Sequence, residues 1–358
     1  MKQFLIQAMQ NILEINYFGY FTPLGGYGIS NLNWVKHLER QGVVVFPHSK
    51  FIPDPSSFEY SILTEEEKEI LNRDFEKKRI GIIETTPFDF GTIDTEIKIA
   101  STMCESDLIG ASWVGACNSM DYVVVPNEFQ RSVFAKSGVD ESKLKVIRSG
   151  TETERFPYFK RPVRDIYTFG IVGYMNERKG VFELIQAFCS EFERWESVRL
   201  YIKTSNKDFA YYSNFTDKRI VVDSRHLSMQ DLNKIYQGFD CFVFPSKAEG
   251  IGQPPREAMS TGLPTIVTNY SGLEEICDEE YCYPIQPMEL RSGENPHTIE
   301  QPGNWAYIDI QELMYTMRYV FEHPEEADEK GKKASLWIKN EHSWSRAAKN
   351  MVDFLKEL

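Results

Sequence analysis

Two glutamates, Glu249 and Glu257, stand at either end of a loop rich in glycine and proline in the segment FPSKAEGIGQPPREAMSTGLPTIV, residues 244–267. The apolar residues before the loop predict a strand, and those after it predict a helix with Glu257 in its first turn. An ordinary strand-to-helix connection needs only an N-cap and one glycine. A plain helix N-terminus would explain Glu257 alone. The surplus of glycine and negative charge therefore predicts a ligand site.

A second loop of this kind is VGYMNERKG, residues 172–180, which again joins a strand to a helix. It opens on Gly173 and carries Arg178 and Lys179 beside the positive end of a helix dipole. That arrangement is suited to a diphosphate. The alternative is a solvated basic turn.

A third loop, TPLGGYGIS, residues 22–30, holds Gly25, Gly26 and Gly28 between the first predicted strand and its helix. Such glycines let backbone amides and a helix N-terminus approach an anion. The loop is not a dinucleotide fingerprint, because Asn31 stands where the third glycine is required. A plain tight turn is the alternative.

Three further polar residues follow predicted strands. Glu84 and Thr85 open the loop ETTPFDFG, and Lys203 ends the strand in LYIKT. Ligands of parallel α/β sheets bind outside the carboxyl ends of the strands, so these residues are candidates for a site. Capping of the sheet end is the alternative for each.

Strand and helix patterns alternate along the chain, which predicts parallel sheets covered by helices. The segment RFPYFKRPVRD, residues 155–165, has no periodicity, and the alternation begins again after it. With 358 residues, the chain exceeds one ordinary core, so we expect two doubly wound α/β domains. Residues 286–307 are polar and rich in aromatics, and no element can be assigned to them.

Composition excludes several classes of protein. The net charge of −13 argues against a protein that coats nucleic acid or anionic lipid. Six cysteines without CxxC spacing indicate reduced thiols in a cytoplasmic protein. No apolar run reaches the roughly 20 residues that span a bilayer. Peripheral contact with a membrane stays open.

The loop EGIGQPPRE and its continuation AMSTGLPTIVT resemble the E-x7-E motif of GT4-type retaining glycosyltransferases of GT-B fold. Other segments between residues 121 and 275 resemble the same family, namely VVVPNEFQRSVFAKSGV, VIRSGTETERF, VGYMNERKG and LSMQDLNKIYQGFDCFVFPSKAEG. The resemblance implies two Rossmann-like domains that face each other across a cleft. Residues 1–157 would form the acceptor-side domain and 158–340 the nucleotide-sugar domain, with a last helix in 341–358 crossing back to the first.

The resemblance also implies roles for the candidate residues. Glu257 would bind the ribose hydroxyls of a nucleotide-sugar donor, and Glu249 the hydroxyls of the transferred sugar. Lys179 matches the phosphate-binding lysine of the family, whereas Tyr174 stands where an arginine is common. Either Arg178 compensates for this loss, or the activity is lower. Glu84 and Thr85 would reach the acceptor side. Amides that approach the donor would come from Gly250, Ile251, Gly252 and Gln253.

A metal-dependent mechanism is not expected. The chain contains no Asp-x-Asp, and its six histidines lack ligand spacing. Amides, Lys179 and a helix N-terminus would stabilise the leaving diphosphate instead. We therefore expect neither a metal nor another cofactor.

The sequence leaves the substrates open. The base of the donor is uracil or guanine, and the acceptor is a glycan, a lipid, a protein or a small molecule. Two other functions fit the pattern less well, namely an epimerase of nucleotide sugars and a nucleotide-sugar-binding protein with weak catalysis.

Overall fold

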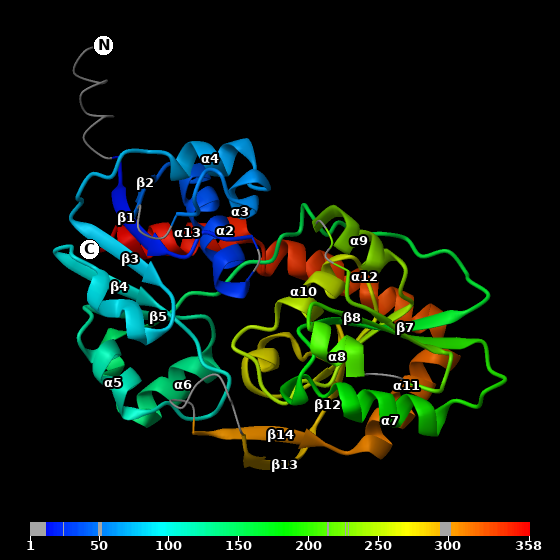
Figure 1. Ribbon diagram of the computed structural model, residues 1–358. Coiled ribbons are helices and arrows are strands. Elements are labelled where there is room, and N and C mark those ends of the chain that lie inside the picture. The colour runs from blue at the N-terminus through cyan, green and yellow to red at the C-terminus, as the bar shows by residue number, and fades with distance from the viewer. Residues whose placement is uncertain are drawn as a thin grey trace. The chain divides into compact units, whose positions relative to one another are not determined.

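The computed structural model describes residues 12–23, 25–48, 52–212, 215–225, 227, 229–293 and 302–358 (Figure 1). The chain forms two compact units. Unit 1 consists of Met1–Met103, Leu108–Gly150 and Trp344–Leu358, and unit 2 of Cys104–Asp107 and Thr151–Ser343. The sequence prediction placed the boundary at residues 157–158. The chain passes between the units at Met103–Cys104, Asp107–Leu108, Gly150–Thr151 and Ser343–Trp344.

Unit 1 contains a six-stranded parallel sheet in the order β2-β1-β3-β4-β5-β6. Its central strands are almost continuously apolar because helices cover both faces of such a sheet. The strands are β1 (Glu14–Gly19), β2 (Val44–Pro47), β3 (Ile80–Glu84), β4 (Ile97–Ser101), β5 (Tyr122–Val125) and β6 (Leu144–Val146). The helices are α2 (Gly26–Arg40), α3 (Phe58–Ser61), α4 (Glu65–Leu71), η2 (Pro87–Thr92), α5 (Ala111–Asn118), α6 (Glu128–Ser137), η3 (Glu141–Lys143) and α13 (Trp344–Leu355).

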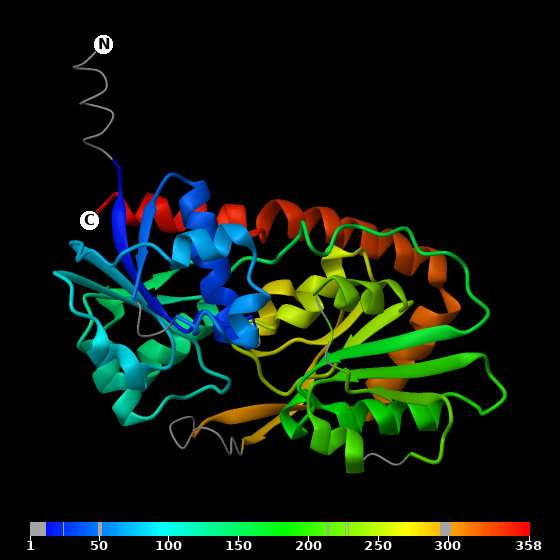
Figure 2. The ribbon, with the colours of Figure 1, turned by 45° about the horizontal axis from the view of Figure 1, so that its top comes forward.

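Unit 2 contains a second six-stranded parallel sheet, in the order β12-β11-β10-β7-β8-β9. Helices α7 and α10 lie on opposite faces of it (Figures 1 and 2). The strands are β7 (Tyr167–Gly173), β8 (Val198–Thr204), β9 (Ile220–Asp223), β10 (Cys241–Phe244), β11 (Thr265–Thr268) and β12 (Tyr283–Ile285). The helices are η4 (Glu177–Lys179), α7 (Val181–Glu191), α8 (Lys207–Tyr212), α9 (Met229–Gln237), α10 (Gln253–Ser260), η5 (Ser271–Ile276), α11 (Ile310–Glu322) and α12 (Pro324–Glu341).

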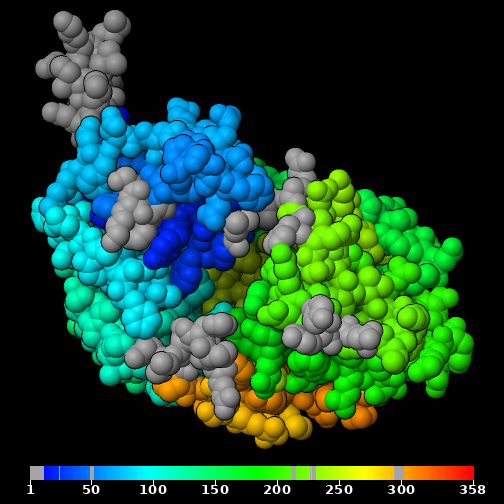
Figure 3. All heavy atoms as spheres, in the orientation of Figure 1, coloured from blue at the N-terminus to red at the C-terminus, as the bar shows by residue number. Residues whose placement is uncertain are grey.

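The stretch that sequence reasoning left unassigned contributes an antiparallel hairpin to unit 2. Its strands are β13 (Pro287–Ser292) and β14 (Asn304–Ile308). The yellow to orange atoms of the hairpin form part of the surface of unit 2 in the space-filling view (Figure 3). Strand β14 nevertheless buries Trp305 and Ala306, so the hairpin is anchored by one strand.

The last helix, α13, belongs to unit 1. Trp344 meets the ring of Trp34 on α2 edge-on, with 5.1 Å between ring centroids. The backbone of Gly150 lies so close that a Cβ there would be 2.3 Å from Cα of Trp344. In unit 2 the neighbouring Thr151 donates its backbone N–H to the carbonyl of His342 over 2.7 Å. The chain segments around Gly150–Thr151 and Ser343–Trp344 are therefore close to each other within unit 1, and they are hydrogen-bonded to each other within unit 2.

No helix within the described ranges combines the length and apolar character needed to cross a membrane.

Candidate functional site

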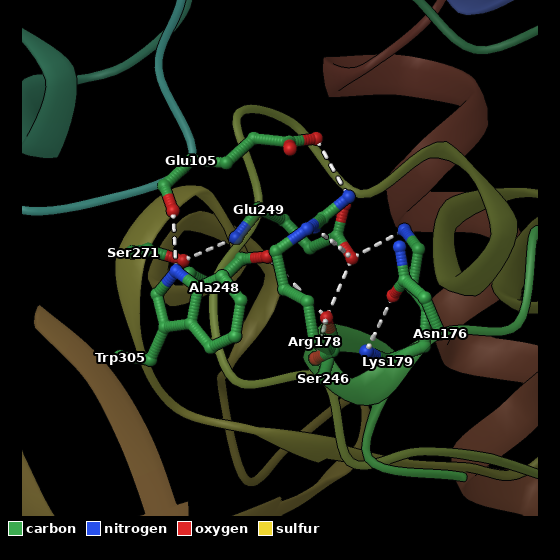
Figure 4. Close-up of polar contacts among 9 residues, drawn as sticks. All are labelled: Glu105, Asn176, Arg178, Lys179, Ser246, Ala248, Glu249, Ser271 and Trp305. Carbon is green, nitrogen blue, oxygen red and sulfur yellow. Dashed lines mark hydrogen bonds and ion pairs between the residues drawn. The ribbon is translucent and has the colours of Figure 1, made fainter. Parts of the chain in front are cut away.

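Three loops of unit 2 meet at one edge of its sheet. They follow β7, β10 and β11, which are neighbours in the strand order. Because parallel strands end at the same edge, the residues after them are brought together. Figure 4 shows Arg178, Lys179, Ser246, Glu249 and Ser271 from these loops in one cluster.

Glu249 is the centre of this cluster. Its Oε1 atom lies 2.5 Å from Nζ of Lys179 and 2.9 Å from a terminal nitrogen of Arg178. The hydroxyl of Ser246 donates to the same oxygen over 2.6 Å. Glu249 is 5% exposed, and each of the two cations is 8% exposed. The predicted phosphate loop and the predicted sugar-binding glutamate therefore form one buried ionic group.

The neighbouring charges decide the ionisation of these groups. Burial alone would raise the pKa of Glu249, but Arg178, Lys179 and the hydrogen bonds lower it well below its usual range. Burial and the adjacent Arg178 lower the pKa of Lys179, although Glu249 acts in the opposite direction. Burial would lower the pKa of Arg178, but Glu249 and Glu105 raise it. The carboxylate of Glu249 and the guanidinium of Arg178 thus both carry charge.

Backbone geometry explains two of the glycines around the cluster. Gly180 has φ +65°, and a Cβ on it would lie 2.0 Å from the carbonyl oxygen of Pro245. No other residue fits where these two loops cross. Gly252 has φ +75° and caps α10 without a side-chain hydrogen bond. Gln253 is the first residue of that helix.

The loop after β11 holds the backbone of Glu249. The Glu249 amide donates to the hydroxyl of Ser271 over 2.8 Å, and the Gly272 amide donates to the Glu249 carbonyl over 2.9 Å. Ser271 has φ +60°, which is unusual for a residue other than glycine. Sequence reasoning missed Ser271, because a serine in a turn carries no distinctive signal.

Glu257 lies on α10 in a different environment. The hydroxyl of Tyr236 donates to its Oε2 atom over 2.7 Å. Burial raises the pKa of Glu257 to about 7, although the hydrogen bond from Tyr236 acts against the shift. The two glutamates of the motif therefore differ in charge state near neutral pH.

Arg256, which sequence reasoning also missed, fixes the loop between the two glutamates. Its side chain is fully buried and donates to the carbonyl of Ile251 over 3.3 Å. It also pairs with Glu275 at 2.5 Å and lies 2.9 Å from Nδ1 of His342. Arginine has only donors, so Nδ1 of His342 accepts. The Ile251 carbonyl of the Gly250–Gly252 loop is thus held by a side chain in the interior of unit 2.

A short segment from elsewhere in the sequence completes the cluster. Oε1 of Glu105 lies 2.7 Å from the second terminal nitrogen of Arg178. The indole N–H of Trp305 donates to the Glu105 carbonyl over 3.1 Å (Figure 4). Nothing local in the sequence indicates this contact, since Glu105 and Arg178 are far apart along the chain.

Lys203 and Gly173 lie at the ends of β8 and β7, and Lys203 is not part of the Glu249 cluster. Its ammonium group donates to the carbonyl of Arg225 over 2.6 Å and to that of Asp223 over 3.2 Å. These bonds connect the end of β8 to the end of β9. They match the alternative that Lys203 caps the end of the sheet. Tyr174 follows Gly173 and is 49% exposed.

The candidates in unit 1 divide into two groups. A Cβ on Gly28 would lie 2.1 Å from the carbonyl oxygen of Thr22, which explains that glycine by packing. Among the described residues, no atom lies within 4 Å of such a Cβ on Gly25 or Gly26, and neither glycine has a positive φ. Packing and backbone conformation therefore do not account for Gly25 and Gly26.

Glu84 is only 2% exposed. It accepts hydrogen bonds from Ser30 over 2.6 Å and from Tyr17 over 2.8 Å. Burial raises its pKa to about 7, although both hydrogen bonds oppose the shift. Thr85 donates to Asp89 over 3.1 Å. Within unit 1 these contacts match the alternative of a capped sheet end, and a role toward an acceptor stays a prediction.

The part of the chain that the structure describes contains no group of three or more His, Cys, Asp or Glu residues that could hold a metal ion.

Comparison with known proteins matches part of the chain to a family. The sequence profile described as Glycosyl transferases group 1 matches residues 166–290, which contain the cluster around Glu249. This match places residues 166–290, about a third of the chain, in the glycosyl transferases group 1. The capsular polysaccharide biosynthesis glycosyltransferase CapM of Staphylococcus aureus is 27% identical over 169 residues. That match covers 42% of this chain and 44% of CapM, so the chain matches less than half the length of that relative.

Solved structures resemble this chain over nearly its whole length. Sucrose-phosphate synthase of Thermosynechococcus elongatus has a TM-score of 0.70 at 14% identity, covering 96% of this chain and 98% of its own. HepE of Anabaena, solved in complex with UDP and glucose, has a TM-score of 0.72 at 13% identity, covering 97% and 100%. At these identities the likeness shows the fold. The predicted class, a two-domain Rossmann-like α/β fold of GT-B type, is confirmed.

Proposed function

We propose that the chain transfers a sugar from a nucleotide-sugar donor to an acceptor, and that unit 2 binds the donor. The observation that carries the proposal is the buried group of Arg178, Lys179 and Glu249 at the carboxyl edge of the sheet. A site that holds two buried cations beside a helix N-terminus suits a diphosphate. The family membership and the UDP complex of the structural neighbour HepE support the same reading.

The diphosphate would lie against Lys179, Arg178 and the start of α10. These groups stabilise negative charge that develops on the leaving phosphate, without a metal ion. Gly252 brings the backbone of the loop toward that point, together with Gly250, Ile251 and Gln253.

The two glutamates would bind the two sugar rings of the donor. Glu257 accepts hydrogen bonds from the ribose, and Glu249, ionised by its cations, accepts them from the transferred sugar. Neither glutamate is expected to form a covalent bond to the sugar. Because the E-x7-E motif resembles that of retaining GT4-type enzymes, we propose that transfer retains the anomeric configuration. The acceptor would attack from the face that the diphosphate leaves, and the donor phosphate would take up the acceptor proton.

Unit 1 would supply the acceptor side. Gly25 and Gly26 leave the start of α2 without side chains and without a packing reason, which suits the approach of a substrate. Glu84 ends the neighbouring strand β3, and Thr85 follows it. The acceptor, the donor sugar and its base stay open, as does peripheral contact with a membrane.

The test is donor turnover. The full chain is incubated with UDP-sugars and GDP-sugars, and released nucleoside diphosphate is measured with and without candidate acceptors. Release from at least one donor, and an α-configured product from an α-configured donor by NMR, are expected. Binding without release from any donor would favour a weakly catalytic binding protein, to which Tyr174 in place of the usual arginine also points.

A further inference from the structure

The segment Cys104–Asp107 is separated from its sequence neighbours in the fold. It belongs to unit 2, although the residues on either side belong to unit 1. Two contacts with β14 hold it. The backbone amide and side-chain amide of Asn304 donate to the carboxylate of Asp107 over 2.6 and 3.1 Å. The indole of Trp305 donates to the carbonyl of Glu105 over 3.1 Å.

This anchoring presents the Glu105 side chain to Arg178. The guanidinium lies between two carboxylates, with one terminal nitrogen 2.9 Å from Glu249 and the other 2.7 Å from Glu105 (Figure 4). The nitrogen that faces Glu249 also donates to the carbonyl of Ala248. Both ends of the planar donor group are thus directed at acceptors of the protein.

The formal charges in this cluster cancel. Arg178 and Lys179 contribute two positive charges, and Glu249 and Glu105 contribute two negative ones. A diphosphate gains little from a neutral group, so one carboxylate must give up its cation when the diphosphate binds. Glu249 is fixed by Ser246, by Lys179 and through its backbone. The Glu105 side chain is 35% exposed, so it can regain water when it leaves Arg178.

We propose that Glu105 sets the affinity of the donor site for a diphosphate by occupying Arg178 in the donor-free protein, and that phosphate oxygens replace it there. Glu105 is then a positioning residue that acts through Arg178. The exchange is chemically direct, because carboxylate and phosphate oxygens bind the same planar donors of arginine. This inference rests on the proposed function of unit 2.

The test uses the full chain and three probes, UDP, GDP and inorganic pyrophosphate, with dissociation constants from titration calorimetry. Glu105→Gln and Glu105→Ala should both bind at least one of these probes more tightly than the wild type, by about two- to tenfold for an ion pair that is partly exposed. An increase in affinity distinguishes the proposal from a structural role, since loss of a structural contact would weaken binding.

Glu177→Gln is the matched control. It removes the same charge one residue before Arg178, but Glu177 faces Nζ of Lys247 at 3.4 Å. Its effect on probe affinity should stay below about twofold, because an exposed carboxylate is screened. A second control places Glu105→Gln in an Arg178→Gln background, where it should no longer change affinity.

The outcomes separate the two proposals. Unchanged or weaker binding by both folded Glu105 variants, or equal tightening by Glu177→Gln, would overturn the role of Glu105 and leave the donor site intact. A wild-type chain that binds none of the three probes would overturn the donor site and this inference with it.

Discussion

Glu249 and Glu257 show how position rather than residue type decides the chemistry of a carboxylate. Ion pairs with Arg178 and Lys179 lower the pKa of Glu249 despite its burial. Glu257 has a tyrosine hydroxyl as its partner, and burial raises its pKa to about 7. Such a separation of pKa values within one motif is characteristic of functional sites.

Replacing Glu249 by Gln should separate catalysis from binding of the diphosphate. Turnover is expected to fall at least about tenfold, because hydrogen bonds from the transferred sugar lose a charged acceptor. Affinity for UDP or GDP should not fall, since Lys179 and Arg178 stay in place. Calorimetry and steady-state kinetics measure the two quantities. Weaker diphosphate binding by a folded Glu249→Gln chain would contradict this division.

The loss of Glu249 should also be visible in stability. Lys179 would lose its carboxylate partner, and Arg178 would keep only Glu105 as a carboxylate partner. Removing one partner of a buried ion pair typically costs about 3–5 kcal/mol of unfolding free energy. Urea unfolding of the donor-free variant measures this cost. The control removes the ion pairs of Arg131, whose partners Glu128 and Glu141 lie on the surface. Their loss should lower the free energy of unfolding by less than about 1 kcal/mol.

The pKa of Glu257 predicts that donor affinity rises with pH. With a pKa of about 7, the ionised fraction of the free protein increases from about one tenth at pH 6 to about nine tenths at pH 8. Ribose hydroxyls bind the ionised form better, so binding near pH 7 should release protons. Calorimetry in buffers of different ionisation enthalpy measures this release.

Glu257→Gln controls for titration of the ligand, because the phosphate of UDP or GDP titrates equally with both proteins. The part of the pH dependence that belongs to Glu257 should disappear in this variant. An identical pH profile for the two proteins would rule out ionisation of Glu257 as the cause.

At the scale of elements, the positions of the loops could be predicted from the sequence. The contacts that join these loops to residues far away in the sequence could not. The loops after β7 and β10 could be found because alternating apolar runs and glycines are local signals. Arg256 and His342, by contrast, are 86 residues apart, and no periodicity links them. The β13–β14 hairpin escaped for a related reason, because its burial depends on contacts with Lys247 and with residues 104–107.

The start of α2 allows a clean substitution test. Gly26→Val should change the free energy of unfolding by less than about 1 kcal/mol. No atom of the described part of the chain lies within 4 Å of the new Cβ, so only helix propensity changes. We expect turnover to fall much more than UDP or GDP affinity, since the proposed donor contacts lie in unit 2.

Gly28→Ala is the matched contrast for Gly26→Val. Its Cβ would meet the carbonyl oxygen of Thr22 at 2.1 Å, so thermal unfolding should shift downward. Normal turnover of Gly26→Val would show that the loop before α2 is a plain turn.

At the scale of the whole molecule, an acidic chain carries its candidate anion site on buried cations. The net charge is −13, yet Arg178 and Lys179 are each only 8% exposed. The fold class followed from the order of strands and helices. Which residues belong to which unit did not follow from that order. Cys104–Asp107 joins unit 2 through single contacts that no sequence pattern encodes.

Transfer is expected to be independent of divalent metals. Protein cations and a helix N-terminus would offset the charge of the leaving diphosphate in place of a metal. Activity measured in excess EDTA should stay within about twofold of the untreated enzyme, since no part of the barrier is assigned to a metal. Loss of activity that magnesium or manganese restores would refute this expectation.

The position of α13 has a consequence for biosynthesis. Helix α13 packs on α2, and Trp344 covers Trp34, although all but four residues of unit 2 lie between Gly150 and Trp344 in the sequence. On the ribosome, the first 150 residues therefore emerge long before their last helix. The nascent unit 1 therefore lacks the helix that packs on α2 for as long as residues 151–343 are being synthesised.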